Sequence, residues 1–140
     1  MAVFNKFDVF SEDLASAKHN LDGSTHSLKL LLTNTAPVAS NAVLADLTEI
    51  AAGNGYNAGG LALSYTRARS GNVTKITCAD TSLTASGGTI GPYRYAVLYN
   101  ATAANGPLIG WWDRGAAKTI EDAGTENFDF DDVNGAFTIS

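Results

Sequence analysis

The chain has 140 residues, of which 45% are hydrophobic and only 16% are charged. This length is typical of one domain that buries its own core without a metal or disulfides, and we expect a single domain over residues 1–140. A net charge of −5 and nine scattered basic residues argue against nucleic-acid binding, which depends on clustered cations. The sequence has one cysteine, no secretory signal and no apolar run long enough to cross a membrane, so we expect a soluble protein made in the cytoplasm.

The first twenty residues have the spacing of an amphipathic helix. Apolar residues recur at intervals of four and three, at Val3, Phe7, Phe10, Leu14, Ala17 and Leu21. Phe4 and Val9 disturb this pattern, so a strand from Val3 to Phe10 remains open. The rings of Phe4, Phe7 and Phe10 either close the core or dock on a neighbouring protein. Because chain termini fray unless they are tied down, we favour docking and treat residues 1–20 as a helix or docking arm.

From His26 onward the sequence predicts mainly short strands. His26–Thr33 is typical of a buried strand, and Val43–Ala52 fits either a short helix or an extended segment. The later strands that we expect are Leu61–Arg69, Asn72–Asp80, Ser82–Ser86, Tyr93–Asn100, Leu108–Asp113, Lys118–Asp122, Glu126–Asp131 and Ala136–Ile139. Gly, Asn and Ser residues separate them, as turns require. Many short strands at this spacing favour a jelly-roll-like antiparallel β-sandwich.

An aromatic hairpin is expected between Gly87 and Gly115. Large side chains alternate along its first strand, at Tyr93, Tyr95, Val97 and Tyr99, and we interpret this face as framework. The second strand carries Trp111 and Trp112, which must point to opposite faces because they are adjacent. One of them therefore belongs to the core, and the other lies at the surface, at an interface or under a loop.

A second hairpin is predicted near residue 140. Phe128 and Phe130 alternate with aspartates before the Asn134–Gly135 dipeptide, and a short apolar run follows it. Asn-Gly is the preferred sequence for a type I′ hairpin turn. The aspartates lack the ligand spacing of an EF-hand calcium loop, and we expect them to face water.

The reactive side chains do not form a recognisable catalytic motif. The two histidines, His19 and His26, lie near the start of the chain, and no nucleophile-elbow serine motif occurs. The glycine clusters lack the lysine that follows a phosphate-binding loop. We expect the thiol of Cys78 to be buried. The residues therefore predict a protein that is not an enzyme and that has no cofactor and no metal.

Several segments resemble one known family. They are Phe4–Phe7, Leu28–Val38, Leu47–Tyr56, Ala85–Tyr95 and Pro107–Asp113, and together they span most of the chain. In these segments the sequence resembles the capsid cement, or decoration, proteins of tailed bacteriophages, in particular those of short-tailed phages that infect Bordetella. The resemblance identifies relatives but no reactive site.

The resemblance implies a jelly-roll-like sandwich that binds the outside of an icosahedral shell and stabilises it. The implied partner is a major capsid protein of the HK97 type, and the protein would be a homodimer or another small homo-oligomer on the virion exterior. The alternative is another virion role, as a tail or fibre component or a glycan-binding receptor module. The candidate contact residues for either role are Phe4, Phe7, Phe10, Trp111 and Trp112.

Overall fold

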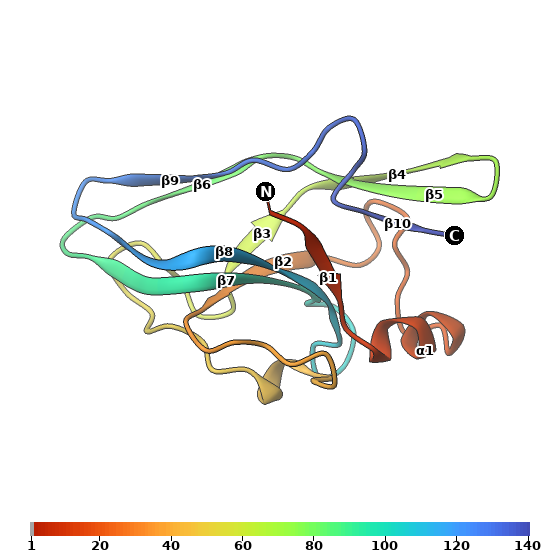
Figure 1. The fold of residues 1–140 in the computed structure, drawn as a ribbon, viewed down its shortest axis with the longest axis horizontal. Coiled ribbons are helices and arrows are strands. Elements are labelled where there is room, and N and C mark those ends of the chain that lie inside the picture. Colours follow the sequence, from red (N-terminus) through yellow and green to blue (C-terminus); the bar gives the residue numbers. More distant parts are fainter. Residues whose placement is uncertain (1) are drawn as a thin grey trace.

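Two layers of antiparallel strands make up the computed structural model, which describes residues 2–140 (Figure 1). In chain order the elements are β1 (Phe4–Lys6), α1 (Val9–Ala15), β2 (Leu28–Thr33), the 3-10 helix η1 (Leu44–Asp46), β3 (Leu61–Leu63), β4 (Tyr65–Ser70), β5 (Val73–Cys78), β6 (Thr81–Thr84), β7 (Ile90–Asn100), β8 (Leu108–Ile120), β9 (Thr125–Phe128) and β10 (Phe137–Ile139). The mainly β, sandwich-like fold with one short helix near the N-terminus confirms the predicted fold class.

One layer is a five-stranded sheet in the order β1-β8-β7-β2-β3. The other layer consists of a three-stranded sheet, β10-β5-β4, and a separate pair, β6-β9. Figure 1 shows the β6–β9 pair above β7 and β8, with the three-stranded sheet continuing from it end to end toward the side of α1. Every strand pair is antiparallel, as expected.

The pairing from β5 to β10 is nested in the manner of a jelly roll. β7 pairs with β8, β6 pairs with β9, and β5 pairs with β10, so the chain forms one long two-stranded ribbon. The ribbon folds over on itself where β6 leads into β7 and β8 leads into β9 (Figure 1). Backbone hydrogen bonds hold this fold-over, from Ala85 N to Gly124 O at 2.9 Å and from Ala123 N to Ala85 O at 2.8 Å. Folding a ribbon in this way encloses a core between its two halves.

The core fills the space between the two layers, and a second, smaller cluster lies on the outer face of the five-stranded sheet. Leu30 and Leu32 of β2 face the larger core, whereas Leu31 between them faces the smaller cluster. Leu44 and Leu47, from the segment that connects β2 to β3, cover that second face. The middle of β2 is therefore apolar on both sides, which explains its unbroken run of leucines.

The N-terminal segment combines the two structures that the sequence left open. It forms a strand from Phe4 to Lys6, which pairs with β8, and then a helix that begins at Val9. Phe4 lies opposite Trp112 in this register. Gly110 allows the close contact, because a Cβ at this position would lie 2.2 Å from two atoms of the Phe4 ring. The segment from Val43 to Ala52 also differs from both alternatives, with one short 3-10 turn inside an irregular stretch.

Irregular pairing in the β7–β8 hairpin breaks the predicted aromatic face. Register shifts occur on both sides of Tyr93. As a result, Tyr93 faces the larger core together with Ala96 and Leu98, whereas Val97 and Tyr99 face the opposite cluster. The expectation that one face carries all four residues was wrong, because bulges shift the alternation by one residue. The two strands predicted for the second half of this region are one continuous strand, β8.

The predicted C-terminal hairpin does not form. β9 pairs with β6 and β10 pairs with β5, so the strands on either side of the Asn-Gly dipeptide have different partners. The Asp131 carboxylate accepts hydrogen bonds from the backbone N–H groups of Val133 and Asn134 at 2.9 and 2.8 Å. This side-chain turn redirects the chain, and Ala136 N then donates to Ile76 O at 2.8 Å. A local turn preference thus gave way to pairing with a distant strand.

Candidate functional site

The three N-terminal phenylalanines close the core of their own domain. The rings of Phe7 and Phe10 are 0% and 2% exposed, and Phe4 is half-buried. Phe10 packs edge-on against Phe137 at a ring distance of 5.6 Å, and Phe4 stacks on the same ring at 5.1 Å. This arrangement corrects the preference for docking, since Phe7 and Phe10 offer no accessible ring surface in this fold. The physical reason is that β1 and the bond from Phe7 N to Ile109 O tie the segment to β8.

Trp111 and Trp112 point to opposite faces of the five-stranded sheet, as predicted. Trp112 is 4% exposed and lies in the larger core, between the rings of Phe4 and Phe130 at 5.3 and 5.5 Å. Trp111 is partly exposed on the other face and packs against Phe7 at 4.5 Å. Of the five candidate contact residues, Trp111 and Phe4 therefore keep part of their surface available.

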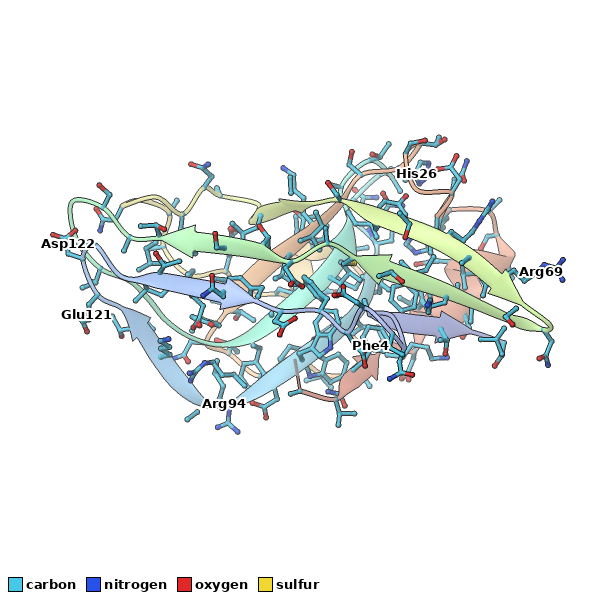
Figure 2. All side chains as sticks on the ribbon, turned by 90° about the horizontal axis from the view of Figure 1, so that it is seen from above. Phe4, His26, Arg69, Arg94, Glu121 and Asp122 are labelled. Carbon is cyan, nitrogen blue, oxygen red and sulfur yellow. The ribbon has the colours of Figure 1, made fainter. Side chains whose placement is uncertain are left out.

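A different surface is open to a partner, and we call residues 65–78, the β4–β5 hairpin, the basic arm. β4 is an edge strand, and each residue from Thr66 to Ser70 is exposed. The arm contains Arg67, Arg69 and Lys75 and no acidic residue. In Figure 2, Arg69 lies at one end of the long axis, and Glu121 and Asp122 lie at the other. Arg69 and the acidic pair Glu121 and Asp122 thus lie at opposite ends of the molecule.

The basic arm is anchored at its base and free along its outer edge. Ile76 and Cys78 of β5 are fully buried, and Phe137 of β10 pairs with Ile76. On the other side of β5, Arg67 lies opposite Ile76 and Arg69 lies opposite Thr74. Burial raises the pKa of the Cys78 thiol to about 12, so this side chain serves packing rather than nucleophilic chemistry.

Sequence reasoning missed the basic arm, although a signal was present. No aspartate or glutamate occurs between Glu49 and Asp80, in a chain that has fourteen acidic residues. Over the whole chain, the nine basic residues look scattered. Their local excess over acidic residues within a single hairpin is the feature that marks this surface.

A small polar cavity opens beside β8 and β9. It has a volume of about 200 Å³, and Tyr93, Arg94, Arg114, Glu126 and Asn127 contribute to its lining. The Glu126 carboxylate accepts a hydrogen bond from the Tyr93 hydroxyl at 2.6 Å, and the Arg114 guanidinium lies 3.9 Å away. Burial and the neighbouring Glu126 raise the pKa of Tyr93. The hydroxyl therefore stays neutral at physiological pH, and the groups can bind a polar ligand through hydrogen bonds.

Charge pairing accounts for the outer rim of this cavity. Arg94 donates two hydrogen bonds to Asp113, at 2.8 and 3.1 Å, and this contact lowers the pKa of the Asp113 carboxyl. Lys118 lies 3.2 Å from Glu126 on the other side. Both carboxylates are thus occupied by cations, and neither is placed as a free general base.

Three polar residues meet near α1, at the end of β7. The side-chain amide nitrogen of Asn100, a residue that is 0% exposed, lies 3.1 Å from His19 Nδ1 and 2.8 Å from His26 Nδ1. His19 is 8% exposed, and its Nε2 atom has no hydrogen-bond partner in the described part of the chain. Sequence reasoning treated both histidines as ordinary structural residues and did not connect them with Asn100, because only the tertiary fold brings the three together.

Within residues 2–140, no group of His, Cys, Asp and Glu side chains is arranged to hold a metal ion. None of the helices in this range is long and apolar enough to cross a membrane. No family model, no curated protein and no solved structure matches the chain.

Proposed function

We propose that this chain is a structural protein of a phage virion, which binds the outer surface of an icosahedral capsid and stabilises the shell. The implied partner is a major capsid protein of the HK97 type. The resemblance of the sequence to capsid cement proteins supports the proposal, and the β-sandwich agrees with the fold that this resemblance implies. The observation that carries it is the basic arm, which presents an exposed edge strand with Arg67 and Arg69 to a partner.

The charge distribution indicates which part of the surface would contact the shell. A net charge of −5 makes most of the surface repel another acidic protein, whereas Arg67 and Arg69 attract one. Arginine is also enriched at protein interfaces, where its planar group forms several hydrogen bonds. The arm is therefore the part of the surface that would bind an acidic region of the shell.

The edge of β4 supplies a second kind of contact. Its outward backbone N–H and C=O groups have no neighbouring strand, because β4 ends the three-stranded sheet. An extended segment of a capsid subunit can add to such an edge through main-chain hydrogen bonds. In a small oligomer, several such arms would bind one shell at once, and avidity would strengthen modest individual contacts.

Binding to undecorated capsids tests the proposal. Purified protein is mixed with capsids, the particles are sedimented, and bound protein is imaged on the shell. The Arg67→Gln/Arg69→Gln variant is compared with Lys6→Gln/Arg114→Gln, which removes the same charge outside the arm. We expect the arm variant to bind roughly 2- to 30-fold more weakly, since each exposed charge contact contributes about 0.2–1 kcal/mol.

The two parts of the proposal fail in different ways. If the wild-type protein does not bind capsids at all, the capsid role is wrong. If it binds and both variants lose the same affinity, or neither does, the shell is bound through another surface. A loss confined to the arm variant supports both parts.

A glycan-binding role is the second candidate, and the polar cavity beside β8 favours it. Tyr93, Glu126 and Asn127 provide hydroxyl, carboxylate and amide groups there, whereas the Trp112 ring is only 4% exposed. Small-molecule sites commonly place a few such polar groups in a cavity. Tryptophan fluorescence that responds to added sugars, but not to purified capsids, would support this role and contradict the capsid proposal.

A further inference from the structure

The cluster of His19, Asn100 and His26 has an orientation that the rest of the chain determines. The side-chain carbonyl oxygen of Asn100, Oδ1, accepts hydrogen bonds from the backbone N–H groups of Thr102 and Ala103, at 3.0 and 3.1 Å. The side-chain NH₂ group must therefore point to the histidines, and it has two hydrogens to donate. One goes to each Nδ1 atom, so both of these nitrogens carry a lone pair and no proton.

The second histidine is bound by a further donor. The backbone N–H of Asn20 lies 3.1 Å from His26 Nδ1 and donates to the same lone pair. A proton on His26 Nδ1 would face two donors. The cluster is thus compatible with neutral imidazoles and incompatible with a proton at either Nδ1.

Protonation of His19 is opposed by its surroundings. Asp13, Lys18 and His26 are the charged or titratable neighbours that act on it, and the Phe10 ring packs edge-on at 5.3 Å. Burial is the largest influence and lowers the pKa of His19 below 6.5, although Asp13 acts in the opposite direction. The Asp13 carboxylate is itself 2% exposed and lies 3.2 Å from Lys18 Nζ, so its charge is already paired.

The cluster joins two parts of the chain, and it adds to the burial of Phe10 and Leu21 and to the hydrogen bond from the Tyr65 hydroxyl to His26 O. His19 and His26 belong to the segment between α1 and β2, and Asn100 ends β7 at the tip of the β7–β8 hairpin. Two more bonds cross nearby, from Ala101 N to Ser27 O and from Ser27 N to Thr102 Oγ1, both at 2.8 Å. Figure 1 shows α1 beyond the end of the five-stranded sheet, beneath the three-stranded sheet, where Phe10 packs against Phe137 of β10.

We propose that His19, Asn100 and His26 form an acid-sensitive latch, which holds residues 9–27 on the sheet while His19 is neutral and loosens them when His19 takes up a proton. The proton would sit on His19 Nδ1, so that its N–H would point at the Asn100 NH₂ group. Two donors would then face each other where a hydrogen bond was before, and the contact would become repulsive. Because the folded segment favours the neutral His19 ring, proton uptake by His19 and docking of the segment oppose each other. The neutral ring contributes stability above pH 6.5, and this contribution is lost as the pH falls below 6.5. The latch does not depend on the proposed capsid role.

Amide hydrogen exchange at pH 7.5 and 5.5 tests the latch in the full chain. After correction for intrinsic exchange, we expect opening of residues 9–27 to increase by up to about tenfold at pH 5.5. The β6–β9 pair, at the opposite end of the molecule from α1, should show no such increase (Figure 1). In the His19→Gln variant, a neutral amide oxygen can still accept from Asn100, so the pH dependence of this segment should become weaker than in the wild type.

The Asn100→Asp variant should reverse the direction of the pH effect on residues 9–27. Its carboxylate still accepts from Thr102 and Ala103, but it attracts a protonated ring, so residues 9–27 should be held more tightly at pH 5.5 than at 7.5. Asn127→Asp adds the same charge at an exposed position of β9 and should behave as the wild type.

Titration of the wild-type protein by NMR gives a readout that needs no variant. The His19 ring should titrate below pH 6.5, and the Asn20 amide signal should move with it. The latch is wrong if segment 9–27 opens equally at both pH values, if His19→Gln retains the wild-type pH dependence, or if His19 titrates at or above 6.5.

Discussion

The N-terminal segment and the basic arm both lie at the edge of a sheet, but opposite kinds of side chain form them. β1 is three residues long, and the neighbouring rings of Phe7 and Trp112 are buried. β4 is six residues long, and five of them are exposed. The comparison teaches that aromatic residues near a terminus can close a sheet edge, whereas an edge strand left exposed carries polar and charged side chains.

Phe7→Ala should produce the largest effect on the N-terminal side of this comparison. The ring is 0% exposed and packs on Trp111, so its loss leaves a cavity. We expect a decrease of about 3–5 kcal/mol in the free energy of unfolding, measured by denaturant titration of tryptophan fluorescence. Val3→Ala removes an apolar side chain that is 79% exposed and should change stability by less than about 0.5 kcal/mol. Similar losses in both variants would mean that the segment is not part of the core.

Gly110→Ala should have the next largest effect, because it breaks the seam between β1 and β8. The added methyl would lie 2.2 Å from the Phe4 ring and 2.7 Å from Asn5 O. We expect unfolding to require about 1–3 kcal/mol less. Phe4→Ala in the same chain removes one of the two clashes, so the double variant should lose less than the sum of the single losses. Simple additivity would contradict this account of Gly110.

Arg67→Gln/Arg69→Gln should have the smallest effect on stability, and this variant tests whether the basic arm differs from the N-terminal segment in contributing little to the fold. Both side chains belong to the exposed part of β4, so we expect a change within about 0.5 kcal/mol by denaturant titration. A loss above about 1 kcal/mol would show that the arginines stabilise the fold. In that case the basic arm would be part of the stabilising framework and not a surface available to a partner.

The sequence predicted the fold where local patterns decide the structure. Alternation and turn residues located most strands, including β2 and the β4–β5 hairpin, and adjacency placed Trp111 and Trp112 on opposite faces. These features depend on backbone geometry within a few residues. The sandwich-like fold follows from the number and spacing of such strands.

The sequence did not predict which distant strands pair with each other. The Asn134–Gly135 dipeptide favours a hairpin, yet β10 gains more by pairing with β5, where Phe137 enters the core. Bulges in β7 shifted the alternation around Tyr93, and the first of them lies at Gly91 and Pro92, residue types that are typical of bulges. The meeting of His19 with Asn100 also needs the tertiary fold, because 81 positions separate them.

The nested pairs of the ribbon have a consequence for the order of folding. The separation along the chain grows outward, from Ala96 with Trp112, through Leu83 with Glu126, to Ile76 with Phe137. Closing a short loop costs less conformational entropy than closing a long one, so the β7–β8 hairpin is the natural nucleus. The other pairs would then zip outward from it, and the base of the basic arm would be completed last.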